Sequence, residues 1–124
     1  MRLIIGGCAQ GKLDYAREKW PDLPVTDGAQ CSPEAAESAL LIDHFHLLVK
    51  RIVESGGDAA GFAARLARVN PQAVVISDEV GMGVVPVDAF EREWREQVGR
   101  SLCVLARASE SVERIVCGIG VKIK

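Results

Sequence analysis

The chain opens with Leu3-Ile4-Ile5-Gly6-Gly7-Cys8-Ala9-Gln10-Gly11-Lys12-Leu13, an apolar run that leads into a glycine-rich segment. The apolar residues predict a buried strand. The spacing Gly6-x4-Gly11-Lys12 is that of a loop that binds nucleotide phosphates through its backbone N–H groups and a lysine. Leu13 stands where such a loop carries the Ser or Thr that ligates Mg²⁺. The sequence therefore predicts nucleotide binding at residues 6–13, and Leu13 raises the question of whether phosphoryl transfer occurs.

The composition is that of a soluble globular protein, and 124 residues are enough for one domain with one core. The net charge is -2 and no block of like charges is present, which argues against nucleic acid as the main partner. No apolar run approaches the roughly 20 residues that span a bilayer, and no signal-peptide pattern opens the chain. We therefore expect one cytoplasmic domain over residues 1–124 without a membrane span.

Strand-like and helix-like segments alternate along the chain. Strands are expected at residues 1–5, 23–26, 73–77, 112–117 and 121–124, and helices at about 12–19, 45–55, 58–70 and 88–108. The segment Leu40-Leu41-Ile42-Asp43 has two interpretations, a buried strand that ends in a carboxylate or the middle of one helix over residues 33–54. We favour the strand because an α/β domain needs a second central strand.

This alternation predicts a doubly wound α/β fold with a mostly parallel sheet of the P-loop nucleotide-binding type. Ligands of such sheets bind outside the carboxyl ends of the strands. The loop over residues 6–12, Asp43 and Glu79 would then meet at one edge of the sheet.

Phosphoryl transfer needs a metal ion and a carboxylate that holds it. Asp43 and Glu79 are the candidates, either as the group that holds Mg²⁺, for which Asp43 is the first choice, or as the acceptor of the hydroxyl proton. Lys12 would neutralise charge on the γ-phosphate. The alternatives are that Asp43 lies on the polar face of a helix and that Glu79 is a loop carboxylate bonded to backbone amides.

The remaining reactive side chains point to less specific roles. His44 and His46 are expected to be an exposed pair at the start of a helix, with a nucleophile or general base as the alternative. Cys8 is interpreted as a spacer within the loop. The four cysteines are scattered without a CxxC pair, so reduced thiols are expected and metal-ligand spacing is absent.

Three segments resemble the adenosylcobinamide kinase / adenosylcobinamide-phosphate guanylyltransferase family. They are Gly6–Lys12, the loop Glu79-Val80-Gly81-Met82-Gly83-Val84-Val85-Pro86, and the ending Gly118-Ile119-Gly120-Val121-Lys122-Ile123-Lys124. The resemblance implies phosphorylation of the aminopropanol hydroxyl of adenosylcobinamide with ATP or GTP, followed by GMP attachment through a guanylylated histidine. It also implies a P-loop domain that assembles as a homo-oligomer and that binds a corrinoid. In this family a strand like residues 40–43 ends in an acidic residue.

The sequence departs from the family at three places. It is shorter between the second strand and Leu40, where the family carries the guanylylated histidine. Leu13 replaces the hydroxyl residue of the loop, and Ser101-Leu102 stands where the family usually has Asn-Gln. We therefore expect an adenosylcobinamide kinase-like enzyme without the guanylyltransferase step. The alternatives are a catalytically silent relative that binds nucleotide, corrinoid or a protein partner, and an oligomerising module that uses the helix at residues 88–108.

Overall fold

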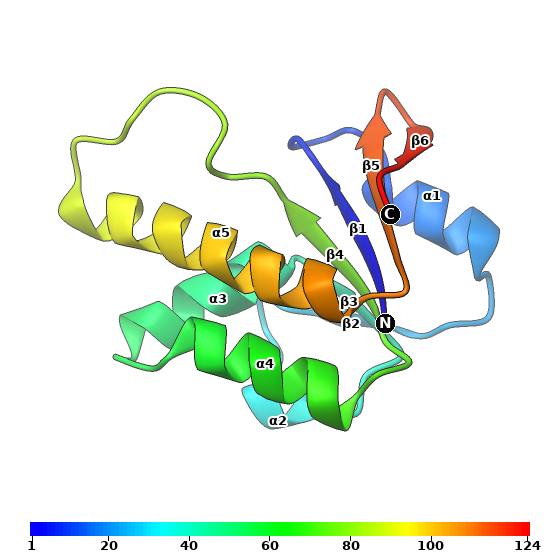
Figure 1. Ribbon diagram of the computed structural model, residues 1–124, viewed down its shortest axis with the longest axis horizontal. Helices are drawn as coiled ribbons and strands as arrows, with labels where there is room; N and C mark the ends of the chain where they lie inside the picture. Colours follow the sequence, from blue (N-terminus) through cyan, green and yellow to red (C-terminus); the bar gives the residue numbers. More distant parts are fainter.

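The computed structural model describes residues 1–124 and contains six strands and five helices. The strands are β1 (Arg2–Gly6), β2 (Val25–Asp27), β3 (Leu41–Asp43), β4 (Val74–Asp78), β5 (Ser111–Val116) and β6 (Ile119–Lys122). The helices are α1 (Lys12–Lys19), α2 (Pro33–Ala36), α3 (Phe45–Glu54), α4 (Ala59–Val69) and α5 (Ala89–Ala108). All six strands form one sheet in the order β2-β3-β4-β1-β5-β6 (Figure 1).

The sheet is parallel apart from its last strand, as the sequence predicts. Strand β1 pairs in parallel with β4 and β5, and β3 pairs in parallel with β2 and β4. Strand β6 returns antiparallel to β5. Strand β4 lies near the middle of the sheet, and its residues 74–77 are at most 1% exposed, which explains why its sequence is apolar without alternation. The predicted α/β fold with a mostly parallel sheet is confirmed.

Successive residues of the strands supply two separate cores. Leu3, Val75 and Val112 face a large cluster that includes residues of α3, α4 and α5. Ile4 and Ile76 face a smaller cluster against α1. Figure 1 shows the same division, with α3, α4 and α5 on one side of the sheet and α1 on the other. Helix α5 is therefore a core helix, because Val98 and Leu105 are buried in or against these layers.

The segment that had two interpretations is a strand. Leu41 and Ile42 are fully buried and pair with β4, and helix α3 begins at Phe45. The Ser32 hydroxyl accepts a hydrogen bond from the N–H of Ala35 as a helix cap, but the helix that it starts, α2, has only four residues. Pairing with β4 therefore outweighs the helical spacing of the apolar residues.

Strands β5 and β6 are joined by a two-residue turn at Cys117-Gly118. Both residues have positive φ, 51° and 77°, which is the geometry of a type I′ hairpin. The turn starts the final strand at Ile119, two residues before the strand expected from sequence. No helix of the chain combines the length and the apolar character that crossing a membrane requires.

Candidate nucleotide-phosphate site

The loop between β1 and α1 is shaped by two glycines. A Cβ on Gly6 would lie 2.6 Å from the carbonyl oxygen of Ile115, so only glycine allows β1 to end this close to β5. Gly11 caps α1 with a φ of 86°, and Ala9 has a φ of 55°. Such alternation of left-handed residues turns successive backbone N–H groups toward one concave side, which suits an anion.

The backbone N–H groups of the loop have no protein acceptor. None of those from Gly7 to Asp14 donates a hydrogen bond to a backbone or side-chain group. They surround the amino-terminal end of α1, where the helix dipole favours negative charge. Unpaired amides of this kind are satisfied by a bound anion or by water.

The β5–β6 turn holds the loop through hydrogen bonds to Gln10. Gln10 accepts two hydrogen bonds from it, from the N–H of Gly118 to its carbonyl oxygen and from the N–H of Cys117 to its Oε1, both 2.8 Å long. A Cβ on Gly11 would lie 3.4 Å from the Cα of Gly118. The β5–β6 turn, part of the chain ending that carries the family resemblance, therefore braces the loop between β1 and α1, a role that sequence reasoning did not reveal.

Lys12 is nearly buried beneath this loop. Its side chain is 8% exposed, and its Nζ donates to the carbonyl oxygen of Gly7 at 2.5 Å and lies 2.7 Å from Asp78 Oδ1. Asp78 ends β4 directly opposite Gly6, the last residue of β1. Sequence reasoning selected Glu79 and missed Asp78, although its position as the last residue of a buried parallel strand was a usable signal.

A cavity of about 450 Å³ opens over the loop. It brings together residues 8–13 of the predicted loop, Asp43 and three residues that were not assigned to the site, Asp14, His44 and Asp78. The residues that line it are Cys8, Ala9, Gln10, Gly11, Lys12, Leu13, Asp14, Asp43, His44 and Asp78. This cavity is the candidate functional site because it joins unpaired amides, a buried lysine and three carboxylates.

Glu79 lies outside this cavity. Its carboxylate pairs with the guanidinium of Arg114 at 2.9 Å, and its N–H donates to the carbonyl oxygen of Gly6 at 2.9 Å. Glu79 borders instead a mainly apolar cavity of about 360 Å³ next to α5. The backbone alternation of strand β4 places adjacent residues on opposite sides, so Asp78 faces Lys12 and Glu79 does not.

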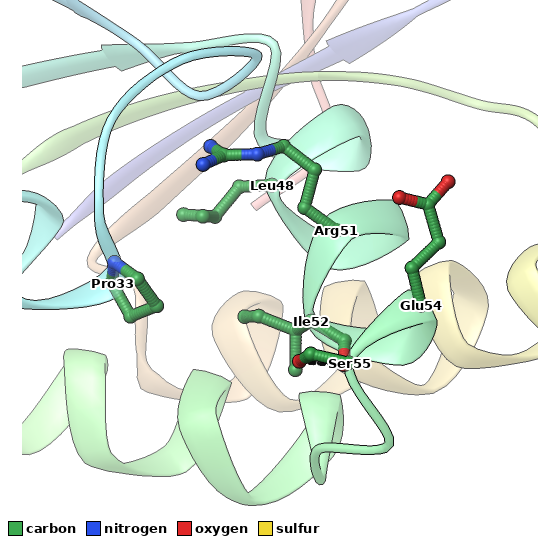
Figure 2. A pocket seen from close by; sticks show the side chains of 6 residues that line it. All are labelled: Pro33, Leu48, Arg51, Ile52, Glu54 and Ser55. Atoms are coloured by element: carbon green, nitrogen blue, oxygen red, sulfur yellow. Dashed lines mark hydrogen bonds between the residues drawn. The ribbon is translucent and has the colours of Figure 1, made fainter.

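A further cavity of about 460 Å³ lies against α3 and is unrelated to the loop. Figure 2 shows Arg51 reaching from α3 toward the segment that precedes Pro33. The Arg51 guanidinium donates to the carbonyl oxygens of Gly28 and Cys31, and the Ser55 hydroxyl donates to that of Ile52. The Arg51 and Ser55 groups are therefore paired within the fold, and Glu54 is the other charged residue that lines the cavity.

The carboxylates of the site suit Mg²⁺ that arrives with a nucleotide. Asp43 and Asp78 provide oxygen ligands, which Mg²⁺ prefers, and Mg²⁺ commonly uses one or two carboxylates together with substrate phosphates. Leu13 provides no oxygen. No group of three or more histidine, cysteine, aspartate or glutamate side chains is arranged to hold a metal ion. The donor set therefore fits a phosphate-bound ion better than one held by the protein alone.

The two histidines differ sharply, and the expectation of an exposed pair is wrong for one of them. The His44 side chain is 46% exposed, and its Nδ1 lies 3.0 Å from Asp27 Oδ1. The His44 backbone has a φ of 53°. His46 is 6% exposed and lies in the first turn of α3. His44 lies just before α3 in a left-handed conformation and its side chain lines the cavity, whereas His46 lies within the helix and is buried.

Their pKa values shift in opposite directions. Partial burial works to lower the pKa of His44, but the hydrogen bond with Asp27 and the charge of Asp43 outweigh it and raise that pKa above its ordinary value. Burial lowers the pKa of His46, although the Asp78 carboxylate opposes the shift. We therefore expect His44 to be charged and His46 neutral between their two pKa values.

Because the chain has two histidines, their titration can be followed by NMR without crowding. We expect the His44 imidazole to titrate above, and the His46 imidazole below, the ordinary histidine pKa of about 6.5. Asp27→Asn should lower the pKa of His44 and leave that of His46 nearly unchanged. Coincident titrations, or no response to Asp27→Asn, would contradict these contacts.

The same shifts make opposite contributions to stability. The contribution of His44, whose folded pKa is raised, is present below its unfolded pKa and is lost as pH rises through its folded pKa. The contribution of His46, whose folded pKa is lowered, is present above its unfolded pKa and is lost as pH falls through its folded pKa.

Comparison with known proteins identifies the family. Residues 20–123 match the model of the family described as cobinamide kinase / cobinamide phosphate guanyltransferase. The chain is 43% identical over 135 residues to the bifunctional adenosylcobalamin biosynthesis protein CobU of Escherichia coli K12, a match that covers 93% of this chain and 74% of the relative. The protein of the same name from Salmonella typhimurium LT2 is 43% identical over 61 residues, 49% of this chain and 34% of the relative.

The E. coli alignment is longer than the chain itself, since it runs over 135 residues against the 124 of this chain. The relative therefore has internal residues that this chain lacks, in agreement with the internal shortening inferred from sequence. The matched segment spans about a third of the length of the Salmonella protein and 74% of the length of the E. coli protein. The chain belongs to the cobinamide kinase / cobinamide phosphate guanyltransferase family.

Proposed function

We propose that this chain binds ATP or GTP at the cavity over residues 6–13 and phosphorylates the aminopropanol hydroxyl of adenosylcobinamide, in the biosynthesis of cobalamin. The observation that carries the proposal is the burial of Lys12 beneath a loop whose backbone N–H groups have no protein acceptor. Family membership supports the substrate class.

The residues of the cavity fit the demands of phosphoryl transfer. The free amides and the α1 dipole would hold the β- and γ-phosphates. Lys12 would exchange its bonds with Gly7 and Asp78 for the γ-phosphate oxygens. Mg²⁺ bound with the nucleotide supplies further neutralisation of charge. Asp43 and Asp78 lie where they can contact that ion or accept a proton.

The transfer itself forms a bond between the substrate hydroxyl oxygen and the γ-phosphorus. The bond from the γ-phosphorus to the bridging oxygen breaks, and the nucleoside diphosphate leaves. The hydroxyl proton passes to a carboxylate, for which we propose Asp43 or Asp78. Glu79, paired with Arg114, has no contact with the reacting atoms in this proposal and supports the end of β4.

The direct test is incubation of the purified protein with adenosylcobinamide and γ-labelled ATP or GTP. The expected result is a labelled phosphate ester of the corrinoid, with no transfer in the absence of Mg²⁺. The E. coli relative serves as the positive control. Failure of both nucleotides to give product, in an assay where the relative is active, would overturn the kinase proposal.

A catalytically silent relative that binds nucleotide or corrinoid is the second candidate, and Leu13 is the observation that favours it. Leu13 is partly buried against the α1 core and places no hydroxyl in the cavity. Cytoplasmic location, homo-oligomeric assembly and corrinoid binding stay predictions from sequence. We propose no guanylyl transfer, because the family segment that carries the guanylylated histidine has no counterpart here.

Leu13→Ser restores the missing hydroxyl. Mg²⁺ should strengthen nucleotide binding by a factor about tenfold larger in this variant than in the unmodified protein, because the hydroxyl adds one ligand to the ion. A tenfold change corresponds to ~1.4 kcal/mol. Calorimetric titration with and without Mg²⁺ measures this gain. Leu13→Ala is the matched control because it loses the same packing without adding an oxygen. Equal Mg²⁺ responses in the two variants would show that residue 13 does not reach the ion.

A further inference from the structure

We propose that His46 is a positioning residue of this site, which orients Asp78 and through it Lys12 without touching the nucleotide. The inference rests on the proposed function for its kinetic consequences, although its geometric part can be tested without activity. His46 does not line the cavity, and it acts through Asp78 alone.

The imidazole contacts Asp78 at two points. Its Nδ1 accepts a hydrogen bond from the backbone N–H of Asp78 at 3.1 Å, and its Nε2 lies 3.5 Å from Asp78 Oδ2. An Nδ1 that accepts carries no hydrogen, so the neutral ring has its hydrogen on Nε2, on the side of the carboxylate. One tautomer therefore satisfies both contacts.

The two oxygens of Asp78 have different partners. Oδ2 faces the His46 ring, and Oδ1 lies 2.7 Å from the Nζ of Lys12. A carboxylate fixed at both oxygens is restricted to one rotamer, and this rotamer aims Oδ1 at the phosphate-binding lysine. When Lys12 moves to a phosphate, the contact with His46 would keep Asp78 from following it.

His46 is itself held from the far side. The indole N–H of Trp94 donates to the carbonyl oxygen of His46 at 2.8 Å, and the two rings lie 6.4 Å apart at an interplanar angle of 31°. Lys50 stacks over the Trp94 ring with its Nζ 4.7 Å from the ring centroid. Helix α5 thus fixes the backbone and the ring plane of His46.

A purely structural role would not require an imidazole at this position. Phe45, Leu48 and Val49 of the same helix are fully buried and apolar. A polar ring among them carries a desolvation cost that its partners must offset. Its two contacts with Asp78 are the ones that do so.

The geometric part is tested by long-range ¹H–¹⁵N correlation of the imidazole nitrogens in the unmodified protein at neutral pH. The expected result is an Nε2–H tautomer for His46. An Nδ1–H tautomer, or a charged ring, would overturn the proposal, because neither can accept the N–H of Asp78. This outcome is independent of whether the protein is a kinase.

The kinetic part uses His46→Leu, His46→Asn and the core control Val49→Ala. We expect His46→Leu to lower kcat about 10- to 100-fold, as loss of a supporting partner typically does, with a much smaller change in the KM for nucleotide. His46→Asn should recover much of kcat, since its amide oxygen can replace Nδ1 as acceptor. Val49→Ala should lose stability and keep kcat.

A double-variant comparison separates positioning from general damage. In a background of Asp78→Asn, His46→Leu should lower kcat by less than twofold, because the residue through which it acts has already been changed. Full additivity of the two losses, or equal loss of kcat in His46→Leu and Val49→Ala, would overturn the proposal. If the unmodified protein has no kinase activity, the proposed function fails and the tautomer measurement still decides this inference.

Discussion

Lys12→Ala should lower kcat/KM for phosphoryl transfer by at least 10²–10³-fold, the usual loss when one electrostatic contact with the transition state is removed. Lys12 lines the cavity beneath the loop amides, and its ammonium group is the one that the proposal places at the γ-phosphate. Without the Lys12 ammonium group, the negative charge of the Asp78 carboxylate is no longer balanced and would repel the phosphates. Steady-state kinetics with ATP and GTP measure the loss.

The matched control for this variant is Lys122→Ala. Lys122 lies exposed on the edge strand β6, so its substitution changes the net charge equally and leaves the cavity intact. It should change kcat/KM by less than twofold. Turnover by Lys12→Ala equal to that of the unmodified protein would remove the loop from the mechanism.

Asp78→Ala should destabilise the protein by about 3 kcal/mol, because it leaves the Lys12 ammonium buried without its counter-charge. The Lys12 side chain is 8% exposed and that of Asp78 20% exposed, so water cannot fully replace the lost partner. The carbonyl oxygen of Gly7 remains as an acceptor, which keeps the expected cost at the lower end for a broken buried pair. For a domain of this size the melting temperature should fall by about 10 °C.

The double variant Lys12→Ala/Asp78→Ala distinguishes this mechanism from simple loss of packing. With both charges removed, no unpaired ion is left, so the double variant should be more stable than Asp78→Ala alone. Thermal unfolding of the four proteins gives the coupling. A double variant whose destabilisation equals the sum of the two single losses would mean that the pair does not interact.

The sequence predicts most of the fold because its strongest signals are local. Residues 73–76 form an uninterrupted apolar run, which is typical of a strand buried on both faces. The Asp58 and Asp88 caps mark the starts of α4 and α5. Residues 40–43 were harder to interpret because a three-residue strand is too short to outweigh a helical spacing of apolar residues. Their conformation is decided by pairing with β4, which is a tertiary contact.

The sequence pointed to the loop and to Asp43, which the structure brings to one cavity, and it did not single out Asp78, His44 or Asp14. The choice between Asp78 and Glu79 depends on which face of the sheet the last residue of β4 presents, and a one-residue shift reverses it. The burial of His46 depends on its contact with Asp78, 32 residues away in sequence. The support of Gln10 by the β5–β6 turn joins residues 107 positions apart. None of these contacts produces a pattern in the local sequence, because each joins residues that are far apart along the chain.

The measurement that tests the central claim most directly is calorimetric titration of the unmodified protein with ATP and with GTP, with and without Mg²⁺, beside Lys12→Ala. The account predicts one site per chain with a Kd on the order of micromolar to millimolar, the range common for nucleotide substrates, and loss of most of this affinity in Lys12→Ala. Absence of binding by either nucleotide in every condition, or equal binding by Lys12→Ala, would contradict it.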